Sequence, residues 1–181
     1  MLVALGLLAA HQTQATDNTY LRALGLLDYT ASHPNATFHY VAINMVLHIH
    51  SNASYLSELK YQSRSGGYYL LGYCSHVAHQ PPPSESAINS PILTLSKILS
   101  NFMASAAEAE IDATFINGQE DIPIRTTLAK LVHAQPPTPL CVDNSTASGF
   151  SNDAMKQKIS KAIDIRFYWV QYCTLCGQFL I

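Results

Sequence analysis

The order of the apolar segments limits what this chain can fold into. Residues 45–50 and 65–74 are short strand-like segments, and the second begins with two glycines, which predicts an antiparallel hairpin. Residues 92–102 predict a third strand, at least over their first half. A helical pattern over 104–133 then precedes a short strand at 139–142, a helix at 159–175 and a strand beginning at 178–181. This order predicts an α/β fold with a mixed sheet and flanking helices.

Glycine and proline positions predict where these elements stop. The segment His79–Ser90 contains three consecutive prolines and is expected to be a loop, and Asn144–Asn152 is small and polar. Inside the long helical segment, we expect a break near Gly118 or Pro123.

The first forty residues have a different pattern. Met1–Ala10 is apolar but too short to span a bilayer, and the first basic residue of the chain is Arg22, which does not suit a signal peptide. We interpret this segment as a buried strand or helix, or as a start inside a larger coding frame. Tyr20–Tyr29 predicts an amphipathic helix that ends near His33.

Composition narrows the class of protein. The 181 residues are 48% hydrophobic and 12% charged, which indicates one folded domain, or one domain with an appended element, rather than a disordered chain. The net charge of −2 gives no overall basic surface, so nucleic-acid binding would depend on local patches. Four cysteines are too few for a disulfide framework and favour a reducing, intracellular compartment. Three N-x-[ST] sequons leave a secreted glycoprotein as an alternative.

Acidic residues stand where a divalent-metal site would need them. Glu108 and Glu110 open the long helix, and Asp143 follows the strand at 139–142. Carboxylate oxygens are the ligands that Mg²⁺ prefers. The two glutamates are about 200° apart around a helix, so both cannot face one metal, and spacing alone does not choose between them. Acids in a first helical turn are also favoured by the helix dipole.

Six segments, in order, resemble the RNase H region of a copia-type LTR retrotransposon polyprotein: LLDYTASHPNATFHY, MVLHIHSNASYLSE, SRSGGYYLLG, SAAEAE, PPTPLCVDNSTASGF and SKAIDIRFYWVQ. The resemblance implies that residues 41–181 form an RNase H-like domain that lacks its last strand and helix. Residues 1–40 are similar to the end of the reverse transcriptase and its helical connection segment.

The resemblance also implies a reaction and its residues. RNase H enzymes cleave the RNA of RNA–DNA hybrids with four carboxylates that hold two Mg²⁺ ions. Glu110 occupies the position of the helix acid and Asp143 that of the fourth-strand acid, whereas Asn52 replaces the first acid. The block with the last acid would follow Ile181. We therefore expect a ribonuclease fold with weak or no activity, whose partners are an RNA–DNA hybrid and the polymerase part of the same polyprotein, and no membrane. The alternative is a non-catalytic nucleic-acid-binding or unselected retrotransposon remnant.

One basic cluster could contact the phosphates of a hybrid, or could be the solvated start of a helix. Its members are Lys156, Lys158, Lys161 and Arg166.

Other residues have less specific patterns. His48 and His50 share a strand face and could hold a transition metal, but we interpret them as half-buried strand residues. Cys173 and Cys176 have zinc-like spacing without a second pair. The neighbouring aromatic residues 168 and 169 are interpreted as core rather than as a stacking platform for bases.

Overall fold

The structure, a computed structural model, describes residues 1–72, 89–143 and 161–181. The side chains of Leu59 and of residues 161–164 are outside the description. Much of the predicted proline loop, the polar segment at 144–152, Lys156 and Lys158 therefore lie outside the described residues. The chain divides into two compact units, Met1–His39 and Tyr40–Ile181, called here the N-terminal and C-terminal units.

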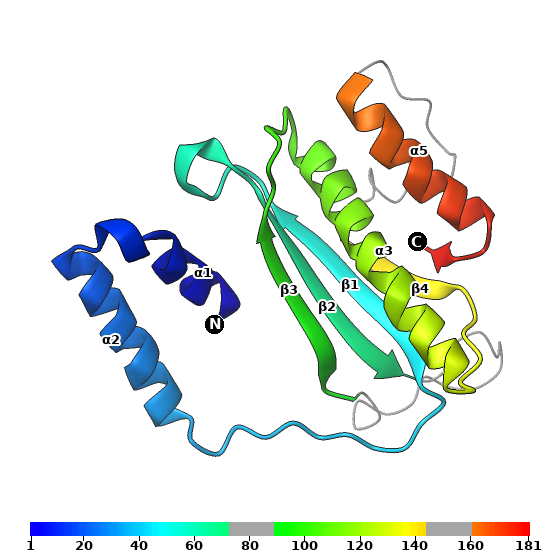
Figure 1. The fold of residues 1–181 in the computed structure, drawn as a ribbon, viewed down its shortest axis with the longest axis horizontal. Coiled ribbons are helices and arrows are strands. Elements are labelled where there is room, and N and C mark those ends of the chain that lie inside the picture. The colour runs from blue at the N-terminus through cyan, green and yellow to red at the C-terminus, as the bar shows by residue number, and fades with distance from the viewer. Residues whose placement is uncertain (73–88, 144–160) are drawn as a thin grey trace. The chain divides into compact units, whose positions relative to one another are not determined.

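The N-terminal unit consists of two helices joined by a short turn (Figure 1). They are α1, Leu2–Ala10, and α2, Asp17–Ser32, with a 3₁₀ turn at Gln12–Gln14 between them. Thr16 caps α2 through reciprocal hydrogen bonds with Thr19. The helix predicted at Tyr20–Tyr29 is confirmed, and Met1–Ala10, which was interpreted as a strand or a helix, is largely helical. The expected burial of Met1–Ala10 is wrong, because neither helix has a buried residue and two short helices alone cannot enclose a core.

The C-terminal unit is built on a five-stranded sheet in the order β3-β2-β1-β4-β5 (Figure 1). Its strands are β1 Val46–Ser54, β2 Arg64–Gly72, β3 Pro91–Ile98, β4 Thr138–Val142 and β5 Phe179–Leu180. The first three strands pair antiparallel, whereas β4 runs parallel to both β1 and β5. A 3₁₀ turn at Leu59–Tyr61 lies between β1 and β2. This mixed sheet with flanking helices confirms the predicted α/β fold.

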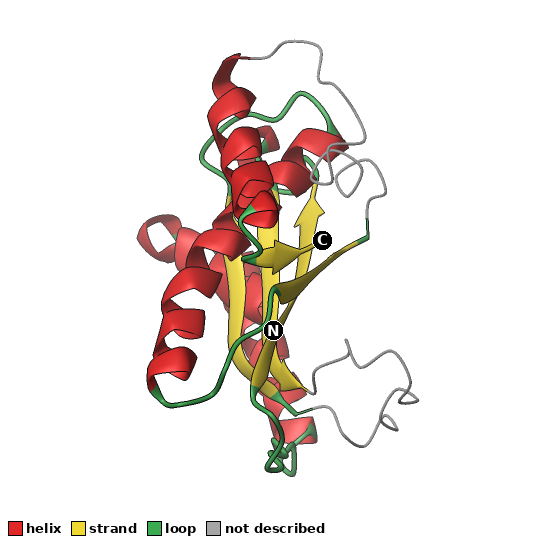
Figure 2. Ribbon diagram, turned by 90° about the vertical axis from the view of Figure 1, so that its right-hand side faces the viewer, coloured by secondary structure: helices red, strands yellow, loops and turns green. Residues whose placement is uncertain are grey.

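Among the described residues of the C-terminal unit, two helices cover the sheet. α3, Ala106–Lys130, packs on β1 and β2, and α5, Lys161–Leu175, packs against α3. Figure 2 shows the strands close to edge-on beside the helices. The main core joins the sheet to α5, and its buried members are Leu47, Ile49, Tyr69, Leu140, Cys173 and Phe179. No helix in the described ranges is long and apolar enough to cross a bilayer.

The predicted break in the long helix is wrong, because α3 continues through both Gly118 and Pro123. A Cβ atom at position 118 would lie 3.1 Å from the Phe179 ring and 3.2 Å from the Trp169 ring. Glycine therefore lets these rings pack directly on the helix. After Pro123, the hydroxyl of Thr127 donates to the proline carbonyl at 2.8 Å. Packing of the helix along its length outweighs the cost of about 3 kcal/mol that an interior proline carries.

The first strand is also longer than predicted. β1 continues to Ser54, whose partner on β2 is Arg64, so Asn52 lies inside the strand and pairs with Gly66. The predicted end of this strand at residue 50 is therefore wrong. Continuous pairing along β2 extends the ladder by several residues.

Candidate metal and nucleic-acid site

Strand register brings two of the predicted site residues next to each other. The parallel strands β1 and β4 pair Ile49 with Leu140 and Ser51 with Val142. The next positions along these strands are Asn52 and Asp143, and both residues are exposed. Parallel strands that run side by side end at the same edge of a sheet. The amide of residue 52 and the carboxylate of residue 143 therefore lie at the same edge.

Helix α3 adds a carboxylate to this region. Glu110 is buried, and its Oε1 accepts a hydrogen bond from the backbone N–H of Ala53 at 2.9 Å. Its Oε2 is also buried but has no hydrogen-bond partner among the described residues. The β1 backbone therefore fixes one oxygen of the carboxylate and leaves the other without a partner.

Electrostatics connect Glu110 with Asp143. Burial raises the pKa of Glu110, and the negative charge of Asp143 raises it further, while the hydrogen bond from Ala53 opposes both effects. An anionic oxygen that is buried without a partner is costly, and a bound cation would remove that cost. The environment of Glu110 therefore suits a cation ligand.

The donor set fits one divalent cation better than two. Mg²⁺ commonly binds through one or two carboxylates and keeps several of its waters. Glu110 and Asp143 could provide these two carboxylates. Asn52 contributes a neutral amide where a second cation would need an anionic ligand. Within residues 1–72, 89–143 and 161–181, no group of three or more His, Cys, Asp or Glu side chains is arranged to hold a metal.

The structure also separates the two glutamates of the helix start. Glu108 accepts a hydrogen bond from the backbone N–H of Ala104 at 2.7 Å, and its own N–H donates to the Ser105 hydroxyl at 3.2 Å. These contacts close the first turn of α3 as a helix cap. Glu108 thus stabilises the helix end, whereas Glu110 faces β1.

The basic cluster is described only in part. Lys161 is the first residue of α5, but its side chain lies outside the described residues. Arg166 pairs with the buried carboxylate of Asp112, and its guanidinium lies 5.6 Å from the centre of the Phe115 ring. Burial raises the pKa of Asp112, while the hydrogen bond and charge of Arg166 lower it. Arg166 therefore joins α5 to α3, and phosphate binding by this cluster stays a prediction.

In the part of the chain that the structure describes, the remaining candidates belong to no group of three or more metal-ligating side chains. His50 is exposed and His48 is half-buried against Gly72. Cys173 belongs to the core and Cys176 is exposed.

The two aromatic residues of α5 have different surroundings. Trp169 packs between the rings of Phe115 and Phe179, as expected of a core residue. The interpretation of Tyr168 as core is wrong, since this side chain is 59% exposed. One residue along a helix turns the side chain by about 100°, which moves it off the buried face.

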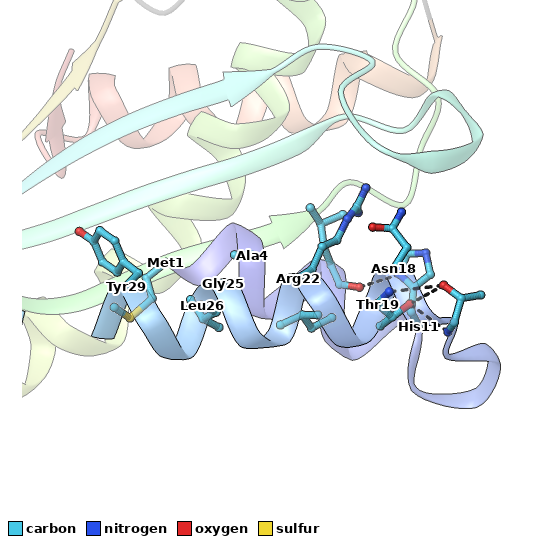
Figure 3. Close-up of a pocket in the computed structure, with 12 residues that line it drawn as sticks. Met1, Ala4, His11, Asn18, Thr19, Arg22, Gly25, Leu26 and Tyr29 are labelled. Atoms are coloured by element: carbon cyan, nitrogen blue, oxygen red, sulfur yellow. Dashed lines mark hydrogen bonds between the residues drawn. The ribbon is translucent and has the colours of Figure 1, made fainter. Parts of the chain in front are cut away.

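A separate cleft of about 680 Å³ lies between α1 and α2 in the N-terminal unit (Figure 3). Aliphatic side chains such as Leu7, Leu8 and Leu26 form much of its wall, and Arg22 and His11 are its basic residues. The lining includes no carboxylate and none of the predicted site residues. This cleft does not suit a metal ion.

Sequence reasoning missed two polar residues of α3, Asn117 and Asp121, which are fully buried. Both interrupt an otherwise helical apolar pattern, and a polar residue on the apolar face of a predicted helix is the signal that could have identified them.

Comparisons with known proteins are limited. No protein-family model and no curated protein matches the sequence. Among solved structures, the chain is similar to RNase H1 from the halophilic archaeon Halobacterium salinarum NRC-1. The TM-score is 0.42 and the sequence identity 11%, over 70% of this chain and 76% of the other. A similarity of this size does not establish a family, and the fold assignment rests on the strand order.

Proposed function

We propose that the C-terminal unit is an RNase H-like domain of a copia-type retrotransposon polyprotein that binds RNA–DNA hybrids but cleaves them weakly or not at all. The observation that carries this proposal is the environment of Glu110. Its buried carboxylate accepts a hydrogen bond from Ala53, and its other oxygen has no hydrogen-bond partner among the described residues. The negative charge of Asp143 raises its pKa.

The same residues support one Mg²⁺ ion rather than a working pair. Glu110 and Asp143 would hold the ion, which when bound would polarise a phosphate oxygen or a water molecule. Asn52 is a neutral amide, so two cations close together would be poorly compensated by two carboxylates. Loss of charge at this position, rather than loss of the fold, is the proposed cause of impaired cleavage.

The resemblance extends this proposal to the rest of the chain. Residues 1–40 correspond to the end of the reverse transcriptase and its connection segment, and the polymerase part of the same polyprotein is a proposed partner. The protein is proposed to act inside the cell. The alternative is that the domain does not cleave and is a nucleic-acid-binding or unselected remnant. The neutral amide of Asn52 supports this alternative over a working nuclease.

Metal binding tests the site without requiring activity. Titration calorimetry of the full chain with Mn²⁺ should show one bound ion. Glu110→Ala and Asp143→Ala should each abolish binding. Glu108→Ala removes the same charge from the same helix and should leave binding unchanged. No Mn²⁺ binding by the unaltered chain, or equal loss in all three variants, would refute the proposed site.

Hybrid binding tests the proposed partner separately. Fluorescence anisotropy with a labelled RNA–DNA hybrid should show binding that weakens as salt increases, because phosphate contacts release counterions. A DNA duplex of the same sequence is the matched competitor. Equal or tighter binding to the DNA duplex would argue against a hybrid-binding domain.

A further inference from the structure

Asn117 is a fully buried polar residue that joins three elements of the C-terminal unit. Its side-chain amide group donates to the Ser51 hydroxyl on β1 at 2.8 Å and to the Gly66 carbonyl on β2 at 2.9 Å. Its Oδ1 accepts a hydrogen bond from the Tyr69 hydroxyl at 2.9 Å. Both amide hydrogens and the amide oxygen are thus used, which fixes the orientation of the side chain.

The space around the side chain of Asn117 is also restricted. A Cβ atom at position 67 would lie 2.2 Å from Oδ1 of Asn117, so only glycine leaves room for the amide. Gly67 is the strand partner of Ser51, which itself binds Asn117. Helix α3 can therefore pack closely on the β1–β2 pair at this point in only one orientation.

This contact lies on the same side of α3 as Glu110. The two residues are seven positions apart, which is within about 20° of two full helical turns. On β1, their contacts are with Ser51 and Ala53, on either side of Asn52. The same helix is thus attached to the same strand at two points, one through Asn117 and one at the candidate metal site. A rotation or shift of α3 would change both.

We propose that Asn117 is a positioning residue that sets the rotation and height of α3, so that Glu110 meets the backbone of Ala53. The expected effect of Asn117 on metal binding rests on the proposed function, whereas its expected effect on the Glu110–Ala53 hydrogen bond does not. The positioning role of Asn117 and the proposed metal site can therefore be refuted separately.

The amide signal of Ala53 reports the hydrogen bond directly. In ¹⁵N-resolved NMR spectra of the full chain, its chemical shift should change with pH as Glu110 titrates. Asn117→Ala should reduce the amplitude of this change at least twofold. Val170→Ala, a buried substitution on α5, serves as the stability control and should leave the amplitude unchanged. Tyr69→Phe keeps the ring but removes the hydroxyl, which donates to Oδ1 of Asn117 at 2.9 Å and to its backbone carbonyl at 3.1 Å, and should give an intermediate loss.

Metal affinity provides a second measurement. Asn117→Ala should weaken Mn²⁺ binding about tenfold, the lower end of what loss of a supporting contact costs. If Asn117→Ala folds and the pH-dependent change of its Ala53 amide shift equals that of the unaltered chain, the proposal is overturned. If Asn117→Ala does not fold, Tyr69→Phe decides, and an unchanged Ala53 titration in it would overturn the proposal equally. If the unaltered chain binds no Mn²⁺, the proposed function fails, and the Ala53 titration still tests the positioning role.

Discussion

The backbone nitrogen of Ala53 donates a hydrogen bond to Oε1 of Glu110 at 2.9 Å. This bond attaches the candidate acid of α3 to β1 through the main chain, immediately after Asn52. The position of Glu110 therefore does not depend on the side chain at residue 52. A substitution there changes the charge of the site and leaves its framework in place.

Replacing Asn52 with aspartate should restore part of the missing charge. We expect Asn52→Asp to strengthen Mn²⁺ binding about tenfold or more, because an added carboxylate attracts the cation. Without metal, the same change should destabilise the fold by about 1 kcal/mol, because it adds a negative charge near those of Glu110 and Asp143. Calorimetry and urea unfolding measure the two effects. Asn52→Ala is the control, and an equal gain in affinity there would contradict the electrostatic account.

The neighbouring glycines of β2 should differ sharply in tolerance. Gly67→Ala places a methyl group against the amide of Asn117, and we expect a loss of about 2 kcal/mol or more in unfolding free energy. At Gly66 the nearest atom to an added Cβ is 3.7 Å away, an ordinary contact. Gly66→Ala should therefore cost less than about 1 kcal/mol. Similar urea midpoints for the two variants would show that the contact with Asn117 is not tight.

Asp121 should make stability depend on pH. Burial raises its pKa to about 6 from 3.8, although the Thr138 hydroxyl and the charge of Arg125 oppose the shift. The folded state therefore binds the proton more tightly than the unfolded state. Its contribution to stability is fully present below about pH 4 and is lost as pH rises to about 6, with a total of about 3 kcal/mol.

Asp121→Asn isolates this contribution. The difference in unfolding free energy between the variant and the unaltered chain should grow in favour of the variant between pH 4 and pH 7. Glu120→Gln, which changes an exposed carboxylate on the same helix, is the matched control. A flat difference for Asp121→Asn would mean that this carboxyl keeps an ordinary pKa.

Much of the fold follows from local patterns. The alternation around His48 and the glycines before Tyr68 predicted the hairpin of β1 and β2, and the spacing of apolar residues predicted α3 and α5. These features depend on neighbours in sequence. Chain order then limited the sheet to a mixed arrangement.

The errors concern contacts between distant residues. Gly118 stays helical because Phe179 and Trp169, some fifty or more residues later, pack against it. The helical pattern can indicate that Asn117 is a buried polar residue, but it does not identify Ser51, Gly66 and Tyr69, which together satisfy its amide. The candidate site shows the same division. Resemblance predicted Glu110 and Asp143, but only the structure shows that Ala53 holds the first of them.

Cleavage of a labelled RNA–DNA hybrid by the full chain, in Mg²⁺ and in Mn²⁺, measures directly whether the site is impaired. We expect the unaltered chain to cleave the hybrid at most about tenfold faster than Glu110→Ala does, because the neutral amide of Asn52 leaves the site with too little negative charge. Metal-dependent cleavage well above that background, lost in Glu110→Ala and kept in Glu108→Ala, would contradict impairment and show a working ribonuclease.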